Sequence, residues 1–427
     1  MKEPSDVTCC VVDHGLFVPL ALKLAEGFKR VLYHSPWEDG FPILDKCIIG
    51  DGFSSIDRCD DIWKAKDDID LFVFPDILHS GLQLELESQG YPVWGSREAD
   101  SIETSREEFI SILKGLRMEV VPHHACEGVT ALRDYLSDRD DCYVKISKYR
   151  GSMETWHWRS WALDEMRIDD LAVKFGPAKE IVPFLVFDSI HTDIELGADT
   201  YCIDGQWPGL IQQGYEAKDE GLMAALRPRE ELPYQIQEVL DKFGPILGKH
   251  RYRNLFSMEI RVKGKQSFFI DPCCRGPLPA SGSQMELYAN LPEIYWYGAN
   301  GELIEPEPAA MFSAECLLTV KDPKGRWSQT EVPKSLRQWM KLGNSCEVDG
   351  RVCFPPDSDN DIGWLVAIGD TPSEVVDTMK DHAAMLPDGV SAKVDSLVDL
   401  IKEIEHAQEK GIDFTDEKMP EPAAVVE

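Results

Sequence analysis

The spacing of apolar residues over the first hundred positions switches repeatedly between strand and helix patterns. An apolar run from Val7 to Val12 is followed by helical spacing over 16–28 and by a second apolar run at 30–35. Two further apolar runs, 69–77 and 91–96, enclose a helical stretch at 81–90. Strands that alternate with helices predict a small parallel sheet with helices on its faces.

Polar residues follow the strands of this predicted sheet. Asp13 and His14 come directly after the first apolar run, and Asp76 lies at the end of the run at 69–77. Ligands of parallel sheets bind beyond the carboxyl ends of the strands. We therefore expect Asp13 and His14 at a substrate site, with Asp76 close by.

The middle of the chain presents a lysine on a strand. Residues 106–118 follow a Thr-Ser cap and have helical spacing, and 129–136 repeat that spacing. In 142–147 apolar and polar residues alternate, which places Lys145 on the face opposite Val144. Lys145 is thus presented across the surface of a strand.

The remaining elements are mixed. Strands are predicted at 180–190, 194–205 and 209–217, a long helix from Pro233 to about Leu247, and mixed strands with one helix between 310 and 385. An amphipathic helix at 396–411 precedes an acidic tail rich in Pro and Glu, which we expect to be flexible.

Residues 255–276, "LFSMEIRVKGKQSFFIDPCCRG", predict a β-hairpin that carries two acids. A three-residue loop at 263–265 puts Asp271 opposite Ser257 and makes Glu259 its diagonal neighbour. Two carboxylates so placed suit Mg²⁺, which takes one or two carboxylates and completes its shell with water and phosphates. The alternative is a pair of solvated acids on an exposed face of the sheet.

Composition narrows the classes of function. The chain has 427 residues, too many for one ordinary core, and 44 basic against 76 acidic residues give a net charge of −32, which disfavours nucleic-acid and anionic-membrane binding. We see neither a signal segment nor an apolar run of about 18 residues, so we expect a cytoplasmic protein. The 12 Cys lack zinc-site spacing and are interpreted as reduced thiols.

Five stretches, taken in order, resemble the ATP-grasp ligases, and among them the phosphoribosylamine–glycine ligases. These stretches are 70–96, 105–122, 143–151, 252–276 and 363–386. The resemblance implies an α/β (α+β ATP-grasp) fold. Its expected parts are a parallel α/β domain at 1–103, an ATP-grasp domain at 104–309 with a small lobe at about 120–188 and the hairpin at 255–276, a C-terminal α+β domain at 310–386, and a helix with a flexible tail at 387–427.

The resemblance also assigns roles to residues. Lys145 matches the strand lysine that contacts the ATP phosphates, and Arg106 stands where the family has a phosphate-contacting lysine. Lys148 belongs to the shortened loop over the phosphates. The backbone from Val182 through Phe184 to Leu185 would bind adenine, Glu195 would lie near the nucleotide sugar, Lys218 and Arg275 near the substrate, and Glu259 and Asp271 would hold the metal.

Two departures from the family pattern bear on chemistry. The family's E-x-N-x-R signature is here Asp271-Pro272-Cys273-Cys274-Arg275, so a thiol replaces one hard oxygen ligand of the metal. The family's glycine-rich phosphate-binding opening is here Asp13-His14-Gly15-Leu16-Phe17. The second change points to a substrate other than phosphoribosylamine.

The expected function is an ATP-dependent ligase that joins a small carboxylate to an amine, with Mg²⁺ or Mn²⁺ as cofactor. Lys145 and Arg275 would be catalytic, the acyl phosphate would be the intermediate, and ADP and phosphate would be released. We expect small-molecule partners and a monomer or homodimer. Two alternatives stay open: a diverged phosphoribosylamine–glycine ligase, and a catalytically silent relative that serves in binding or assembly.

Overall fold

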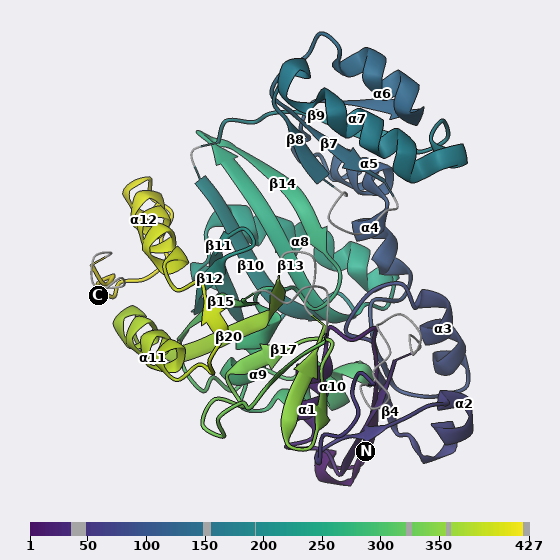
Figure 1. Cartoon of the computed structure of the whole chain (residues 1–427), viewed down its shortest axis with the longest axis vertical. Coiled ribbons are helices and arrows are strands. Elements are labelled where there is room, and N and C mark those ends of the chain that lie inside the picture. Colours follow the sequence, from purple (N-terminus) through teal and green to yellow (C-terminus); the bar gives the residue numbers. More distant parts are fainter. Residues whose placement is uncertain (36–47, 148–154, 193, 322–326, 356–359, 422–427) are drawn as a thin grey trace. The chain divides into compact units, whose positions relative to one another are not determined.

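The computed structural model describes residues 1–35, 48–147, 155–192, 194–321, 327–355 and 360–421 (Figure 1). Within this part the chain forms two compact units. Unit 1 comprises Met1–Glu98, Leu196–Met258 and Cys273–Glu427, and unit 2 comprises Ala99–Glu195 and Glu259–Pro272. Both units combine segments that are distant in the sequence.

Unit 1 begins with the parallel sheet that the apolar pattern predicts. Its order is β3–β2–β1–β4–β5, and the pairs are parallel. The strands are β1 (Thr8–Val12), β2 (Arg30–His34), β3 (Asp57–Arg58), β4 (Leu71–Val73) and β5 (Val93–Trp94), with helices α1 (Val18–Leu24), α2 (Ile62–Ala65) and α3 (Ser80–Ser88). The predicted α/β start is confirmed; the short β3 and α2 were not predicted, because two to four residues show no period.

A larger sheet of order β14–β13–β10–β11–β12–β15–β20–β17 follows, with β21 paired with β15. Its strands are β10 (Ile194–Ile203), β11 (Leu210–Ala217), β12 (Gly221–Pro228), β13 (Arg253–Lys263), β14 (Gln266–Cys273), β15 (Phe312–Val320), β17 (Met340–Leu342), β20 (Asp361–Gly369) and β21 (Val390–Ala392). The pairs from β10 to β15 and on to β20 and β17 are antiparallel where their register is defined. A smaller antiparallel sheet joins β16 (Ser328–Thr330), β19 (Arg351–Phe354) and β18 (Cys346–Val348).

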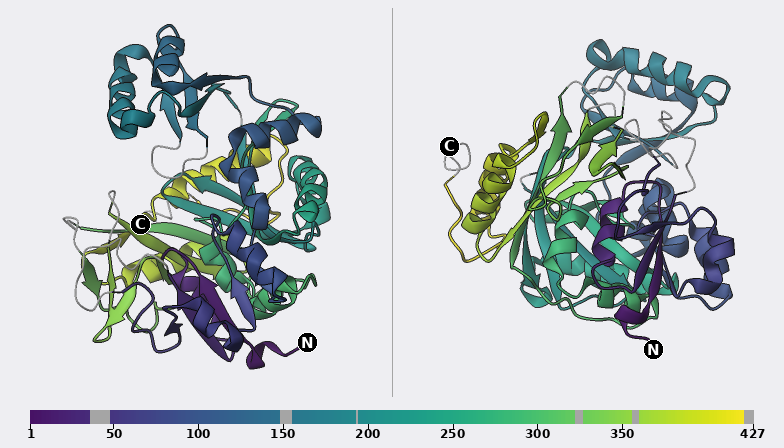
Figure 2. Two further views of the ribbon diagram at one scale, coloured as in Figure 1. Left: turned by 90° about the vertical axis from the view of Figure 1, so that its right-hand side faces the viewer. Right: turned by 60° about the horizontal axis from the view of Figure 1, so that its bottom comes forward.

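Helices of unit 1 cover these sheets. They are α8 (Tyr234–Lys249), α9 (Ser281–Leu287), α10 (Leu291–Ala299), α11 (Pro372–Ala384) and α12 (Ser396–Glu409). Helix α10 contacts β4 and β5, and α9 contacts α1, β15 and β20. In Figure 2 the green helices of this segment lie beside the purple and blue N-terminal strands. The main core of unit 1 therefore joins the N-terminal sheet to the larger one through α9 and α10, with side chains such as Trp94, Tyr201 and Tyr295 in contact.

The C-terminal segment departs from the expected flexible tail. Helix α12 is amphipathic as predicted, and it buries Leu400, Ile401 and Ile404 over β11 and β12. Beyond it Phe414 is only 1% exposed and contacts the rings of Tyr215 and Phe312. The prediction of a flexible tail is therefore wrong for this part, because one aromatic side chain fixes the segment to the sheet.

Unit 2 contains a sheet of order β6–β9–β7–β8. Its elements are α4 (Asp100–Thr104), α5 (Arg106–Gly115), β6 (His123–Glu127), α6 (Gly128–Leu136), β7 (Cys142–Ile146), β8 (Thr155–Trp158), α7 (Trp161–Phe175) and β9 (Pro183–Asp188). The Ser105 side chain caps α5 by accepting from the N–H of Glu108. The core lies between this sheet and α6 and α7, and Trp158 is fully buried in it.

In the part of the chain that the structure describes, we find no helix whose length and apolar character would let it cross a membrane.

Candidate functional site

Three of the expected site residues meet within unit 2. Strand β7 presents Lys145, helix α5 begins at Arg106, and β14 carries Asp271. The Lys145 Nζ donates to Asp271 Oδ2 at 2.5 Å, and the Arg106 guanidinium donates to the other carboxylate oxygen. The two cations are 7% and 6% exposed, so each is held in place largely out of water. An ammonium group and a guanidinium group thus face one carboxylate.

The ion pairs set the charge of Asp271. Burial by itself would raise the pKa of this carboxyl, but the charges of Arg106 and Lys145 outweigh burial and hold the pKa at about 2. Asp271 is therefore ionised at neutral pH, and the group of three carries a net charge of about +1. An anion with more charge than a carboxylate would compete with Asp271 for both cations.

The entry of α5 is tied to the end of β7. The Arg106 backbone N–H donates to Ser147 Oγ at 3.3 Å, and that hydroxyl donates to Glu107 Oε2 at 2.6 Å. The Phe109 ring packs edge-on against Phe269, with ring centroids 5.1 Å apart. These contacts fix where the side chains of Arg106 and Lys145 can reach.

The expected hairpin geometry is wrong in its loop. Strand β13 runs to Lys263 and β14 begins at Gln266, which leaves two loop residues rather than three. Gly264 adopts φ +60°, a left-handed conformation that favours glycine at the first position of such a turn. The loop is therefore one residue shorter than the loop from which the diagonal pairing of Glu259 with Asp271 was predicted.

Glu259 has partners of its own. It accepts from Arg261 Nε at 3.2 Å, and Arg261 also pairs with Glu195 at 2.7 Å. Sequence reasoning missed Arg261, although its place two residues after Glu259 on the same strand puts both on one face. Glu195 and Glu259, expected at the nucleotide sugar and the metal, are thus joined through one guanidinium.

The two acids expected to hold magnesium are paired with cations. Among the described residues no group of three or more acids, His or Cys is placed to hold a metal ion. Asp271 is engaged by two cations and Glu259 by a third. The thiol of Cys273 lies 3.7 Å from the Arg275 carbonyl oxygen, and sulfur is a poor ligand for Mg²⁺.

The expected adenine-binding backbone lies inside a sheet. Phe184 and Leu185 belong to β9, which pairs with β6 on one side and β7 on the other. The Val182 carbonyl accepts from the N–H of Gly128 at 2.9 Å. The backbone groups of Phe184 and Leu185 are directed to neighbouring strands, so the structure corrects this assignment. Lys148 lies outside the described residues.

A second group of expected residues gathers in unit 1, at the carboxyl ends of β1 and β4. His14 Nε2 lies 2.7 Å from His79 Nε2, and the two rings stack at 4.6 Å. Arg275 Nε is 3.6 Å from Asp76 Oδ1. The Gly276 N–H donates to the Pro75 carbonyl at 2.8 Å, which joins the end of the signature to the end of β4.

The two histidines are neutral at pH 7. Burial lowers the pKa of His14, and burial together with the charge of His14 lowers that of His79 to about 4. One ring nitrogen must then donate and the other accept across their contact. The sequence did not single out His79, because nothing local shows that it reaches His14.

Asp13 anchors the loop after β1. Its Oδ2 accepts from the N–H groups of Gly15 and Phe17 and from the Tyr33 hydroxyl, at 2.9, 2.7 and 2.7 Å. Burial raises its pKa to about 6 despite these bonds. Lys218, by contrast, is exposed in the turn between β11 and β12, whereas the histidine pair follows β1 and β4.

Two further buried acids were not predicted from the sequence. Asp199 on β10 and Glu315 on β15 are 5% and 0% exposed, and burial raises the pKa of each to about 7. Glu315 Oε1 accepts from the N–H groups of Ala280 and Ser283 at 3.0 and 2.6 Å. The only local signal was an acid inside an apolar strand pattern.

Solved structures with the same arrangement identify the fold. Phosphoribosylamine–glycine ligase from Thermotoga maritima superposes with a TM-score of 0.67 at 14% identity, over 90% of this chain and 99% of that one. The biotin carboxylase domain of Hydrogenobacter thermophilus 2-oxoglutarate carboxylase, in complex with MgADP, ADP and bicarbonate, gives 0.64 at 13% identity over 97% of both chains. The L-amino acid ligase of Bacillus licheniformis gives 0.58 at 12% identity, over 92% of this chain and 99% of that one.

The chain therefore has the ATP-grasp fold, as the five stretches predict. Neither a protein-family model nor a curated protein sequence matches it. At these identities the likeness establishes the fold alone, and the substrate must be argued from the residues of this chain.

The ion pairs of Asp271 predict a pH-dependent effect on stability. The folded pKa is lowered, so the stabilisation is complete above the unfolded pKa near 4 and is lost as pH falls through about 2. Asp271→Asn should lower the free energy of unfolding by about 1 kcal/mol at pH 7, after allowance for the partial exposure of the carboxyl. Denaturant unfolding between pH 7 and pH 3 should show the difference narrowing, whereas the exposed Asp219→Asn should change little; a constant difference would contradict this account.

Glu315 predicts the opposite trend. Its folded pKa is raised, so its favourable contribution is present below the unfolded pKa near 4.5 and is lost as pH rises through about 7. Glu315→Gln keeps an oxygen for the two backbone donors and removes the ionisation. It should raise the free energy of unfolding by about 1–3 kcal/mol at pH 8 and much less at pH 5. Thermal unfolding at both pH values, with exposed Glu409→Gln as control, measures this; equal effects at both would refute it.

Proposed function

We propose that the chain binds ATP through unit 2 and uses it to couple a carboxylate to an amine. The observation that carries this proposal is the meeting of Lys145 and Arg106 at Asp271, since two ordered and nearly buried cations are suited to a phosphate chain. The ATP-grasp fold supports the same role. Because the phosphates carry several negative charges, they would replace Asp271 as the partner of both cations.

The reaction needs positioning and charge neutralisation more than covalent help. The substrate carboxylate attacks the γ-phosphorus, the bond to ADP breaks, and the acyl phosphate is then attacked by the amine, which loses a proton as phosphate leaves. Lys145 and Arg106 would offset charge on the transferring group. ATP enters as its magnesium complex, and no step here relies on a protein-bound metal.

We assign the substrate to the group at the carboxyl ends of β1 and β4. Arg275 offers a guanidinium for a carboxylate, and the ring nitrogens of the His14–His79 pair offer hydrogen bonds to an amine. Asp13 would act by holding the loop that carries His14. The loop at 13–17 lacks the glycine-rich phosphate site of the phosphoribosylamine–glycine ligases, which supports a different amine. Lys218 and Glu195 remain proposed contacts to substrate and sugar.

A specific observation also favours a catalytically silent relative. The cations expected at the phosphates are already neutralised in part by Asp271, and Cys273 replaces an oxygen ligand. A protein of this kind could keep the fold and lose turnover. Nucleotide binding separates the two proposals.

Lys145→Ala is the direct test. Titration calorimetry should show that the wild type binds MgATP, and that Lys145→Ala weakens binding at least about tenfold, because a buried phosphate contact is removed. ADP release with panels of carboxylates and amines should fall in parallel. Lys114→Ala, on the exposed face of α5, is the matched control and should bind as the wild type does.

Asp271→Asn distinguishes competition from metal binding. Without magnesium this variant should bind ATP at least as tightly as the wild type, because a competing anion has been removed while both cations remain. If the wild type fails to bind ATP with or without magnesium, the silent alternative is favoured. Unchanged binding by Lys145→Ala would remove the basis for the proposed site.

A further inference from the structure

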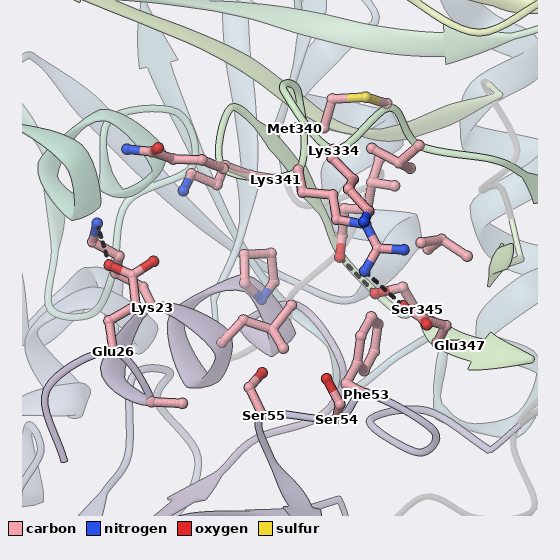
Figure 3. Close-up of a pocket in the computed structure, with 18 of the residues that line it drawn as sticks. Lys23, Glu26, Phe53, Ser54, Ser55, Lys334, Met340, Lys341, Ser345 and Glu347 are labelled. Carbon is pink, nitrogen blue, oxygen red and sulfur yellow. Dashed lines mark hydrogen bonds and ion pairs between the residues drawn. The ribbon is translucent and has the colours of Figure 1, made fainter. Parts of the chain in front are cut away.

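A cavity of about 390 Å³ lies in unit 1, apart from the residues discussed above. Helix α1, the loop at 53–55, Glu286 of α9, the segment 332–338, β17 and β18 line it. In Figure 3 Lys23 and Glu26 lie on one side, Ser345 and Glu347 on the other, and Phe53, Ser54 and Ser55 below. Its volume falls in the range of pockets that hold small molecules.

The inner part of the cavity is a closed ion-pair network. Glu286 accepts from Lys341 at 2.5 Å, from Gln338 at 2.5 Å and from Lys23 at 3.1 Å, and Lys23 also pairs with Glu26 at 2.8 Å. The Glu286 and Lys341 side chains are 1% and 8% exposed. Each buried charge therefore has its counter-charge, and this network gives the cavity a rigid polar side.

The outer part carries an excess of positive charge. Arg337 pairs with Glu347 at 3.2 Å. Lys334 is exposed, and no described residue forms an ion pair or hydrogen bond with it. The lining thus holds four cationic side chains, Lys23, Lys334, Arg337 and Lys341, against three carboxylates, Glu26, Glu286 and Glu347, in a chain whose net charge is −32. This local sign favours an anion, which the rest of the surface repels.

Apolar side chains form the remaining wall. Leu22 of α1, Phe53 of the loop, and Met340 of β17 are among them, and Met340 is 5% exposed. Ser54 and Ser55 add hydroxyls at the lower edge. A ligand that fills the space must therefore combine an anionic group with an apolar body.

We propose that this cavity is a second ligand site, for a small organic anion whose carboxylate or phosphate lies at Lys334 and Arg337 while its apolar body packs against Phe53 and Met340. The pocket differs from the ATP and substrate sites in the elements that line it. A ligand here contacts both α1 and β17, so it would bridge the N-terminal and C-terminal segments of unit 1.

Phenyl phosphate and benzoate are suitable probes, with benzyl alcohol as the neutral analogue. Titration of the full chain by ligand-observed NMR in about 50 mM salt should show at least one anion binding in the millimolar range or tighter, and benzyl alcohol at least about tenfold weaker. Raising the salt to about 300 mM should weaken the binding of the anions and leave the binding of benzyl alcohol unchanged. The stronger of the two anions identifies the head group.

Two variants locate the binding. Lys334→Glu reverses an exposed charge without removing a contact of the fold. It should lower the affinity for the anion about tenfold or more. Phe53→Ala should weaken the phenyl probes and leave the salt dependence intact. Lys410→Glu, an equal change of charge at the end of α12, should have no effect.

The proposal is overturned if neither anion binds, if benzyl alcohol binds as well as they do, or if Lys334→Glu and Lys410→Glu give the same affinity. The result of this test does not depend on the ATP site, because the Lys145→Ala variant should bind the probes as the wild type does. Failure of the probes alone would leave the proposed ligase function standing.

Discussion

The pairing of one carboxylate with two cations constrains the proposed ATP site more than any other interaction among the described residues. Asp271 draws Lys145 from β7 and Arg106 from α5 to one point of unit 2. Removing water from three charges is costly, and it is tolerated because each has a close partner of opposite sign. The same arrangement leaves a small excess of positive charge, which is what a phosphate chain requires of a protein with so many acids.

Three buried acids of the chain fall into two classes. Asp271 stays ionised because two cations hold its pKa at about 2. Glu286 stays ionised beside Lys341 and Lys23, which lower its pKa against the effect of burial. Glu315 has no such neighbours close enough to prevail, and burial raises its pKa to about 7. Where an acid has a cation beside it, it stays charged at neutral pH; where it has none, its burial is a cost to stability that rises with pH.

The fold of this chain depends on few residue identities, whereas its chemistry depends on particular side chains. Backbone arrangements match those of ligases and carboxylases at 10–14% identity, which shows how little of the sequence the ATP-grasp fold requires. The side chains at the two candidate sites differ from the family pattern at Cys273 and at Asp13 to Phe17. Under the proposed function these positions, rather than the fold, decide which substrate is used and whether turnover survives.

Periodicity alone determined the elements and the faces of their side chains. Strand β1, helices α1, α5 and α12, and the placement of Lys145 on the face opposite Val144 all follow from spacing, because burial against a core imposes that spacing directly. The parallel sheet at the N-terminus follows in the same way. The order of five stretches then indicated the ATP-grasp fold, since no single one of them is intact.

Tertiary structure decided which groups meet. Asp271 lies 126 residues from Lys145 and 165 from Arg106, and a spacing pattern reports that a side chain faces inward without naming its neighbour. The sequence Lys-Gly-Lys permits a hairpin loop of two or three residues. In the folded chain Gly264 adopts a left-handed conformation, which is typical of the shorter loop. His79, Arg261 and the packed Phe414 belong to the same class: each acquires its role from a partner that the chain brings to it only on folding.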